Sequence, residues 1–370
     1  MKEAVIVSAV RTPLGAFGGS LSTMGATELG AVVIAEAVRR AGIDPAVVSE
    51  VIMGMVLPCG YGQNPARQAS VKAGLPWEVE CLTVNKVLAG GMENMSMAPY
   101  YLERARFGYR MGPGTLQDHM LHDGLWDVVN DFHMGMSNEL CCEKYGVSRE
   151  DQDRYAELSY MRALNSIRSG LFEKEIVPVT LPRGGRNGND RFSVDECPRE
   201  TSYETLAKMK PAFKDGGVGT AGNSSVISDG AAAVVVMSRE KAEALGCRVI
   251  AGIGAQAAYG IDMKYVLMAP VWAIPKCLDR EGIGIGDVDL FEINEAFSGS
   301  TVAVMRELGI DTEKVNVNGG SVALGHPIGA SGCRVLVTLV HEMERRDVQT
   351  GLASLCLGGG EAVAMVVKRD

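Results

Sequence analysis

The sequence has no apolar run of about 18 residues, which is the length that a membrane-spanning helix needs. It has no basic stripe interleaved with aromatic side chains, and its net charge is −9, so we expect no nucleic-acid partner. The apolar run Ala4–Ala9 is too short for a secretion signal and is followed by Arg11 and Pro13. These absences predict a cytoplasmic protein with no membrane partner.

Cysteine usage indicates neither a disulfide framework nor a metal site. The nine cysteines are odd in number, and several lie in apolar or helical surroundings, such as Cys247, Cys277 and Cys333. The spacings of cysteine and histidine fit no usual pattern of metal ligands. We therefore expect free thiols in a reducing compartment and no metal cofactor.

The 370 residues, 46% of them apolar, are too many for one ordinary core, so two or three domains are expected. Hydrophobic periodicity and capping residues predict the following elements. The strands are Ala4–Ala9, Val51–Val56, Leu82–Val87 and Gly230–Ser238; the helices are Thr27–Ala41, Pro65–Ala73 and Glu150–Ser169; Gly90–Met97 begins a loop, and Gly184–Asn189 is an exposed turn.

The second half of the chain repeats the order of elements in the first half. Residues 27–56 are predicted to run helix, turn and strand, and residues 270–294 have the same order. Two shorter echoes accompany them: Thr83-Val84-Asn85 with Asn316-Val317-Asn318, and Ala89-Gly90-Gly91 with Gly358-Gly359-Gly360. We therefore expect two similar α/β halves related by a pseudo-twofold axis.

One stretch of the first half is too short for this repeat. The second half spans 42 positions from 318 to 360, which hold a loop, a predicted helix (330–345) and a strand (353–357). The first half spans only 6 positions from 85 to 91, with no room for either element. A domain without this helix and strand should have a hole in its sheet. We infer that a segment of the polypeptide is absent from the sequence; a true deletion is the alternative.

Two segments near the C-terminus carry residues suited to acid–base chemistry. His326 lies between glycines, which allow a ligand to approach closely, and a neutral imidazole can act as a general base toward a thiol. Cys356 ends an apolar strand and precedes three glycines, whose N–H groups can face an oxyanion. Its thiol is suited to moving a proton at an α-carbon. A packed imidazole and a buried apolar thiol are the structural alternatives.

A third segment completes a recognisable set. By itself, Asn294-Glu295-Ala296-Phe297 is also compatible with a turn and a helix N-cap. Followed by Gly325-His326-Pro327 and Cys356-Leu357-Gly358-Gly359-Gly360, it resembles the thiolase family of acetyl-CoA acetyltransferases. The resemblance covers essentially the whole chain, and further matching segments are Val10–Pro13, Gly62–Gln68, Ala89–Glu93 and Thr220–Ser225. Ketoacyl synthases also pair cysteine with histidine but lack this combination.

The resemblance implies acyl transfer between two coenzyme A thioesters, with no cofactor besides that substrate. In the family, a nucleophilic cysteine takes the acyl group, and the residue matching His326 activates it. His326, and Asn294 through a water, would stabilise the enolate oxygen, while Cys356 would remove or return the α-proton. The backbone N–H of Gly358 would help to hold the tetrahedral oxyanion. Two acetyl-CoA would give acetoacetyl-CoA and CoA, and thiolysis is the reverse.

The resemblance also implies an architecture. The expected fold is α/β, with duplicated βαβαβαββ halves layered α-β-α-β-α. The first half would comprise residues 1–99 and 216–247, and the second half residues 248–370. Residues 100–215 would form an inserted helical and loop subdomain for CoA binding and oligomerisation, in a homodimer or homotetramer. Substrate-contact positions would be His133, Met134, Phe213, Ala221, Ser225, Ala296 and Phe297, with ordinary packing as the alternative for Phe213 and Ala221.

The sequence departs from the family pattern where the nucleophile belongs. The family has a Cys-x-Ser-Gly segment directly after the strand that matches Thr83–Val87, and this segment is absent between Val87 and Ala89. Neither Cys59 nor Cys81 has the loop-to-helix context that lowers the pKa of a thiol.

A second departure and the missing nucleophile leave questions open. Val266–Trp272 replaces a glycine-richer segment near the acyl pocket, so the acyl chain length is open. One hypothesis is a short-chain thiolase whose nucleophile segment is missing from the sequence. The other is a non-catalytic thiolase-fold protein that binds acyl-CoA or serves as a partner subunit. A ketoacyl-synthase-like enzyme with a carrier protein is disfavoured by Gly325-His326-Pro327.

Overall fold

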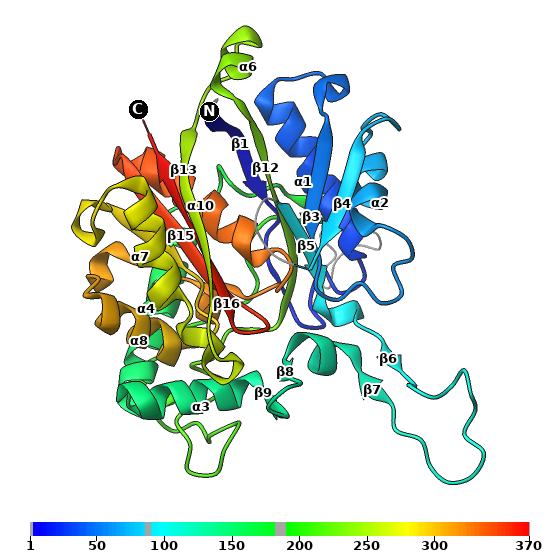
Figure 1. The fold of residues 1–370 in the computed structure, drawn as a ribbon, viewed down its shortest axis with the longest axis vertical. Helices are drawn as coiled ribbons and strands as arrows, with labels where there is room; N and C mark the ends of the chain where they lie inside the picture. The colour runs from blue at the N-terminus through cyan, green and yellow to red at the C-terminus, as the bar shows by residue number, and fades with distance from the viewer. Residues whose placement is uncertain (1–2, 86–89, 182–189, 370) are drawn as a thin grey trace.

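A single mixed β-sheet forms the centre of the protein in the computed structural model, which describes residues 3–85, 90–181 and 190–369. The strand order is β14-β15-β16-β13-β1-β12-β5-β3-β4, with β2 paired to β12 (Figure 1). The strands are β1 (Ala4–Arg11), β2 (Gly15–Ala16), β3 (Glu50–Gly54), β4 (Glu80–Val84), β5 (Gly90–Asn94), β12 (Ser228–Ser238), β13 (Ala251–Gly260), β14 (Leu290–Ile293), β15 (Thr350–Leu357) and β16 (Glu361–Lys368).

The sheet consists of two halves with the same topology. They meet where β1 pairs antiparallel with β13, at Val5 with Gly252 and Ile6 with Ala251. Outward from this seam, β1-β12-β5-β3 in one half corresponds to β13-β16-β15-β14 in the other. In both series the first contacts are antiparallel and the last is parallel. The predicted duplicated α/β fold is therefore confirmed.

Helices form layers on either side of the two half-sheets. Apolar side chains of α1 (Ala26–Ala41) and α2 (Pro65–Lys72) pack with those of β3, β5 and β12. On the opposite side, α7 (Pro270–Glu281) and α8 (Ser298–Leu308) pack with β14, β15 and β16. Between the halves lies α10 (Ser331–Arg346), which contacts β1, β12 and β5 of one half and β14 and β15 of the other (Figure 1).

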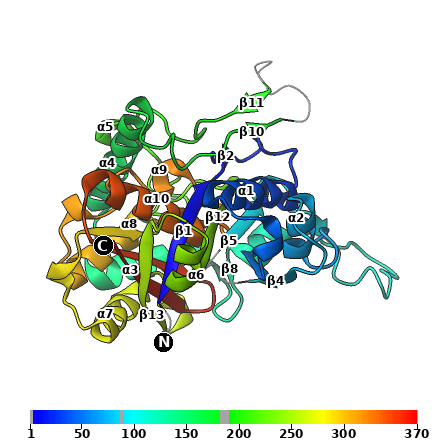
Figure 2. The same ribbon diagram turned by 90° about the horizontal axis from the view of Figure 1, so that it is seen from above.

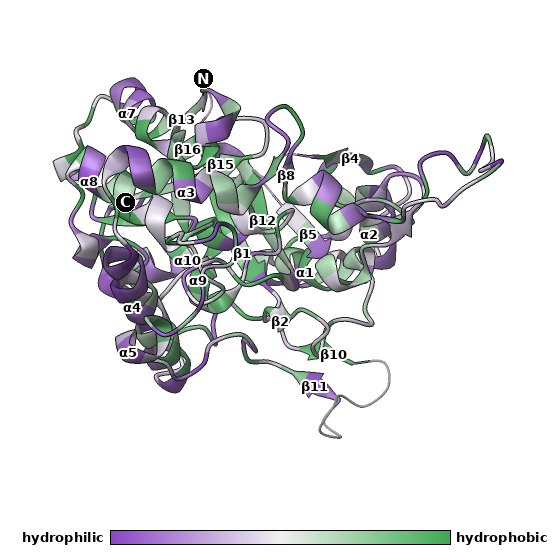
Figure 3. Ribbon diagram, turned by 90° about the horizontal axis from the view of Figure 1, so that it is seen from below, coloured by the Kyte–Doolittle hydropathy of each residue, from purple (hydrophilic) through white to green (hydrophobic). Residues whose placement is uncertain are grey.

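The sequence of α10 explains its central position. A helix that is buried on nearly every side must be apolar around most of its circumference. Most of α10 from Ser331 to Val340 is fully buried, and its apolar residues pack with strands of both halves. The two buried charged residues, Arg334 and Glu342, have hydrogen-bond partners. In Figure 3 the central strands β1 and β12 are green, whereas much of α4 at the rim is purple.

The segment between β5 and β12 is mostly helix and loop. Its helices are α3 (Met134–Tyr145), α4 (Arg149–Arg168) and α5 (Tyr203–Leu206), and α6 (Arg239–Ala244) follows β12. Its short strands pair as β6 (Tyr100–Tyr101) with β7 (Gln117–Asp118), β8 (Trp126–Asp127) with β9 (Phe132–His133), and β10 (Val179–Thr180) with β11 (Arg191–Phe192), which extends from the body in Figure 2. The turn predicted at Gly184–Asn189 lies outside the described residues.

The prediction of a loop beginning at Gly90 is wrong, because Gly90–Asn94 is the buried strand β5. Its glycines are required by tertiary packing. A methyl group on Gly91 would overlap the carbonyl oxygen of Gly329 and lie 2.7 Å from the Cα of Ala330. Gly91 therefore allows the loop before α10 to approach the strand, a requirement that local sequence does not reveal.

The predicted correspondence of Ala89-Gly90-Gly91 with Gly358-Gly359-Gly360 is also wrong. β5 occupies the place in its half that β15 occupies in the other. The glycines at 358–360 form the turn after β15, so the similarity is one of composition only. Helix α1 begins at Ala26 after Gly25, one residue before the predicted start at Thr27.

The sheet has the hole that the sequence spacing predicts. β3 is parallel to both β4 and β5, and its Gly54 lies opposite Val84 on one side and Gly91 on the other. β5 therefore starts at the level where β4 ends. Parallel strands ordinarily need a crossover of a dozen or more residues, but here only residues 85–89 intervene. The segment predicted to be absent between Val87 and Ala89 falls outside the described residues.

Two strand lengths show the consequence of this short link. β5 has 5 residues, whereas its counterpart β15 has 8. In the described part of the chain, the first half also has no helix equivalent to α10. Separately, none of the described helices is long and apolar enough to cross a membrane.

Replacing Gly91 tests the close approach of β5 to the loop before α10. Gly91→Ala should lower the free energy of unfolding by about 1–3 kcal/mol, because its methyl group collides with backbone that cannot move freely. The control is Gly286→Ala, since a methyl group there meets nothing within 4 Å and should change stability by no more than about 0.5 kcal/mol. Urea denaturation measures both, and equal stabilities would contradict the packing described here.

Candidate active site

A cavity of about 620 Å³ opens beside the carboxyl end of β15. Its wall includes the turn after β15, the loop before α10 and the segment between β7 and α3. Eight of the sequence-predicted site residues line it: His326, Cys356, Gly358, His133, Met134, Ser225, Ala296 and Phe297. The structure thus brings together residues from both halves and from the segment between β5 and β12.

His326 is fixed by the loop between the short helix α9 (Ser321–Leu324) and α10. Its backbone N–H donates to the carbonyl oxygen of Val226 at 2.8 Å. The ring Nδ1 lies 2.6 Å from Ser331 Oγ, and Ser331 Oγ donates to the carbonyl of Pro327 at 3.0 Å. Because the hydroxyl proton is used there, the imidazole donates from Nδ1. The lone pair is then on Nε2.

Asn294 is held against this lone pair by a chain of hydrogen bonds. Its Nδ2 lies 3.4 Å from Nε2 of His326. Its Oδ1 accepts from Ser321 Oγ at 2.6 Å, and Ser321 Oγ accepts from the guanidinium of Arg334 at 3.1 Å. Asn294 is buried behind His326 and does not line the cavity. The buried Arg334 on α10 therefore fixes the orientation of the amide.

Burial controls the protonation of the two groups that can move protons. Burial lowers the pKa of His326 to about 4, and the positive charge of Arg334 acts in the same direction. His326 is therefore a neutral base at neutral pH. Burial raises the pKa of Cys356 to about 11, so its thiol carries a proton at neutral pH. The site thus combines a neutral base with a protonated thiol.

The turn after Cys356 leaves the cavity wall open. Gly359 and Gly360 have φ angles of 90° and 86°, which only glycine adopts readily. A methyl group on Gly358 would meet nothing within 4 Å, so space is available next to its backbone. The turn is tied to the loop after β13, because Ile261 N–H donates to the Gly360 carbonyl at 2.7 Å.

Aromatic rings form a second layer behind the cavity wall. The ring of His133 stacks on Phe213 at 5.1 Å between centroids, and Phe213 meets Phe297 edge-on at 5.8 Å. Phe213 does not itself line the cavity but supports two residues that do. Ala221 is exposed and is not part of the wall, so the structure does not bring it into the site.

A buried carboxylate near the site was not singled out from the sequence. Glu93, the fourth residue of β5, accepts hydrogen bonds from Val56 N–H at 2.8 Å, Leu57 N–H at 3.3 Å and Gly329 N–H at 3.0 Å. Through these bonds, Glu93 links the segment after β3 with the loop that carries His326. Burial raises its pKa to about 7. Only its place in the segment Ala89–Glu93 hinted at a role.

Other wall residues also escaped the sequence analysis. His122, Asp123 and Trp126 line the cavity, but no spacing or motif marks them. Val266 and Leu267 also line it, and they belong to the segment that departs from the family pattern. Their apolar side chains form part of the cavity wall.

Cys356 is the one thiol among the described residues that line the cavity. Cys59 is exposed, and Cys81 lies on β4 with its thiol donating to the Val79 carbonyl at 3.5 Å. Neither lies in the cavity wall. A reaction that needs two thiols in one site therefore lacks one of them in the described part of the chain.

The pKa of His326 predicts a pH-dependent stability. Its pKa in the folded state, about 4, is below its usual value of 6.5, so protons bind preferentially to the unfolded chain as the pH falls through this window. Relative to His326→Gln, the wild-type protein should lose of the order of 2 kcal/mol of unfolding free energy between pH 7 and pH 5. The comparison cancels the buried acids Glu93 and Glu292, whose raised pKa values act with the opposite sign. Parallel stability curves in urea would contradict a neutral, partly buried imidazole.

Comparison with known proteins gives matches over nearly the whole chain. The thiolase N-terminal domain model matches residues 4–88 and 86–240, and the thiolase C-terminal domain model matches residues 247–369. The acetyl-CoA acetyltransferases of Pseudomonas aeruginosa and Cupriavidus necator are each 50% identical to this chain, with 100% of both chains covered. The solved structure of acetyl-CoA acetyltransferase from Syntrophomonas wolfei superposes with a TM-score of 0.95 at 38% identity, again covering 100% of both chains.

The same comparisons include positions that this chain does not fill. The alignment with the Pseudomonas aeruginosa protein spans 395 positions, whereas this chain has 370 residues, so at least 25 positions hold no residue of this chain. The two segments that match the N-terminal domain model meet at residues 86–88, between β4 and β5. With both domain models matched and the fold shared, the chain belongs to the thiolase family.

Proposed function

We propose that this protein is an acyl-CoA C-acyltransferase that interconverts two acetyl-CoA with acetoacetyl-CoA and CoA. The observation that carries the proposal is the meeting of His326, Cys356 and Gly358 at one cavity, with Asn294 directly behind His326, in a member of the thiolase family. The names of the 50% identical relatives support acetyl-CoA as the substrate. No resident cofactor is needed for this chemistry.

His326 would serve first as a base and then as a hydrogen-bond donor. Its Nε2 carries the lone pair, so it accepts the proton of an attacking thiol. The N–H formed in this way then donates to the thioester oxygen as negative charge develops there. Asn294, held by Ser321, lies against the same edge of the ring, and it would act through a water so that the two groups together stabilise the enolate oxygen.

Cys356 would move the α-proton of the second thioester. Its thiol is protonated at neutral pH, which suits the thiolysis direction, where a carbon atom must gain a proton. In condensation, the thiolate removes that proton instead. The open backbone of Gly358 beside it provides an N–H for the tetrahedral intermediate. Val266 and Leu267 favour a short acyl chain, because their side chains occupy the wall.

The thiol that carries the acyl group is the component that the described residues do not supply. We place it in the segment whose absence is inferred between Val87 and Ala89. The alternative is a non-catalytic protein that binds acyl-CoA or acts as a partner subunit. Two observations favour this alternative for the chain as it stands: Cys356 is the only thiol among the described wall residues, and at least 25 alignment positions are empty.

We further propose the organisation that the family resemblance implies. Residues 100–215 would form the inserted domain for CoA binding and oligomerisation, between a first half (1–99 with 216–247) and a second half (248–370). A CoA role for the inserted domain is supported by His133, which lines the cavity, and by Phe213, which stacks behind it, since both belong to this domain. A homodimer or homotetramer in the cytoplasm is the proposed state, and the nine free cysteines suit a reducing compartment.

Thiolysis of acetoacetyl-CoA by free CoA tests the assigned roles. His326→Ala and Cys356→Ala should each reduce the rate at least about 100-fold, since each variant removes a group that moves a proton. The control is Cys247→Ala, which removes a thiol outside the cavity wall and should leave the rate unchanged. Circular dichroism checks that each variant is folded, and full turnover in either active-site variant would overturn its role.

The intact mass of the purified protein separates the two functional hypotheses. A mass of 39.3 kDa without thiolysis, but with binding of acetyl-CoA, would favour the non-catalytic alternative. A mass about 2–3 kDa higher, which is the weight of one further helix and strand, would show that the protein contains the missing segment. The nucleophilic cysteine would then belong to that segment.

A further inference from the structure

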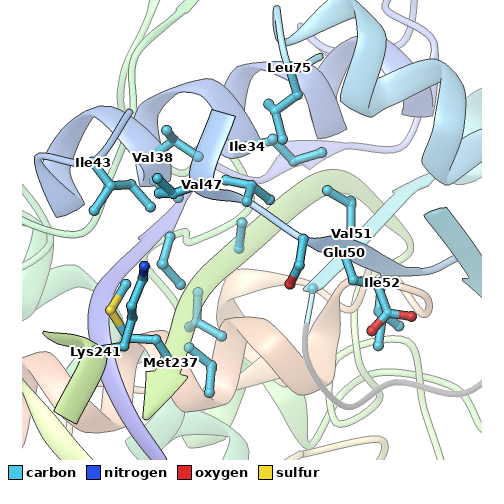
Figure 4. Close-up of a pocket in the computed structure, with 18 of the residues that line it drawn as sticks. Ile34, Val38, Ile43, Val47, Glu50, Val51, Ile52, Leu75, Met237 and Lys241 are labelled. Carbon is cyan, nitrogen blue, oxygen red and sulfur yellow. The ribbon is translucent and has the colours of Figure 1, made fainter. Parts of the chain in front are cut away.

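The hole in the sheet belongs to the first half of the protein, and the end of β14 lies outside it. A cavity of about 660 Å³ lies in this hole, with Ile34 and Val38 on one side and Met237 on the other (Figure 4). In the second half, β15 pairs with the whole of β14, whereas β5 meets β3 only at Gly54. The residues at the end of β14 therefore have their neighbouring strand in place.

Glu295 is a buried carboxylate directly after β14 and Asn294. Within Asn294–Phe297, it is the residue that takes no part in the proposed chemistry or in substrate contact. Its side chain is completely buried. Four neutral groups of the described structure donate hydrogen bonds to it: Tyr155 Oη at 2.9 Å, Ser159 Oγ at 2.8 Å, Asn316 Nδ2 at 3.0 Å and the N–H of Val322 at 3.0 Å. Both carboxylate oxygens accept, so the contacts suit the ionised form.

Two of these donors come from α4, in the segment between β5 and β12. Tyr155 and Ser159 lie one turn apart and therefore on the same face of the helix. Burial raises the pKa of Tyr155 well above its usual value, so its hydroxyl keeps the proton that it donates. Ser159 Oγ also accepts from the N–H of Gly320 at 3.1 Å. These contacts join α4 to the end of β14 and to the start of α9.

Two glycines before α9 allow this close packing. Gly319 has a φ angle of 80°, and a methyl group on it would lie 2.6 Å from the carbonyl oxygen of Ser159. A methyl group on Gly320 would overlap the carboxylate of Glu295. Larger residues at these two positions would therefore separate α4 from the loop, and Glu295 would lose its partners.

The contacts of Glu295 hold the backbone on both sides of Asn294. Asn316 accepts from the N–H of Ile293 at 2.9 Å and donates to the carbonyl of Ile293 at 2.8 Å, in addition to its bond with Glu295. The residues before and after Asn294 are thus bound to the same amide. The peptide units next to Asn294 cannot rotate without breaking hydrogen bonds that are buried.

The same carboxylate reaches the helix that leads to His326. It binds the N–H of Val322, and the preceding residue Ser321 donates to Asn294 Oδ1 at 2.6 Å. Glu295 and Asn294 therefore hold two successive residues of α9, and His326 follows two residues after this helix ends. The relative position of Asn294 and His326, whose Nδ2 and Nε2 atoms lie 3.4 Å apart, depends on this arrangement.

We propose that Glu295 is a positioning residue for Asn294 and His326, held in place by Tyr155 and Ser159 of α4. Glu295 does not line the cavity, so it acts through its neighbours and not on the substrate. Loss of its contacts would move Asn294 relative to His326 and weaken the stabilisation of the enolate oxygen, while the rest of the cavity wall still binds substrate. The kinetic consequence rests on the proposed function, whereas the geometry can be measured without turnover.

Two variants remove contacts of Glu295, and a third is their control. Tyr155→Phe deletes one donor and keeps the ring, and Glu295→Gln places an amide N–H group among the donors. The control is Tyr160→Phe, because Tyr160 is also buried on α4 but makes no described hydrogen bond to Glu295. In thiolysis, Glu295→Gln should lower kcat at least about tenfold and Tyr155→Phe at least about threefold, with KM changed less than about twofold. Tyr160→Phe should leave both constants unchanged.

Nitrogen NMR of protein with isotope-labelled histidine provides a readout that needs no turnover. His326→Gln identifies the Nε2 resonance of His326, because that signal disappears. The resonance should move in Tyr155→Phe and in Glu295→Gln, since Asn294 Nδ2 no longer lies at the same distance from Nε2. It should not move in Tyr160→Phe. Circular dichroism checks folding, and Tyr155→Phe carries the test if Glu295→Gln does not fold.

The two readouts separate this inference from the proposed function. Absence of thiolysis in the wild-type protein would contradict the proposed function, and the resonance of His326 would still decide the positioning role. An unmoved resonance in Tyr155→Phe would overturn that role, even in an active thiolase. A loss of activity confined to KM would also overturn it, and so would an equal loss in Tyr160→Phe, which would indicate a general effect of changes in α4.

Discussion

The burial of α10 between the two half-sheets is the constraint on which the rest of the structure depends. Its apolar residues complete a core shared by both halves. Its first turn holds Ser331, which orients His326, and its Arg334 reaches Ser321 and thereby Asn294. The loop in front of it lies so close to β5 that only glycine fits at position 91. A single helix thus carries both the core and the geometry of the site.

The protonation of the site follows from the same burial. A guanidinium behind Asn294 and an apolar environment both disfavour a positive charge on His326. The thiol of Cys356 stays protonated because the same environment disfavours a negative charge. Glu93 lies on the other side of the loop before α10. The groups that donate hydrogen bonds to it in the described structure are backbone N–H groups and not cations. The packing around this site therefore also determines the protonation of its groups.

The sequence predicted the features that repeat or that carry motifs. Periodicity located the long helices and most strands, and the unequal spacing of Asn85–Gly91 and Asn318–Gly360 revealed the hole in the sheet. Features that arise from tertiary approach were not predictable. Gly91 looked like a loop residue, because the neighbour that demands glycine there, Gly329, is about 240 positions away. Glu93 resembled any other acid, and the exposure of Ala221 depends on how the loop before β12 packs.

The shared helix has a consequence for the balance between the two halves. The first half has fewer strand contacts than the second, since β5 is short and two edges are open. If the first half unfolded alone, one face of α10 would lose the strands that cover it. Apolar side chains that both halves bury would then be exposed. Its local unfolding is therefore coupled to that of the complete half. The second half therefore stabilises the first half through α10. The first half unfolds more cooperatively than its own contacts would allow.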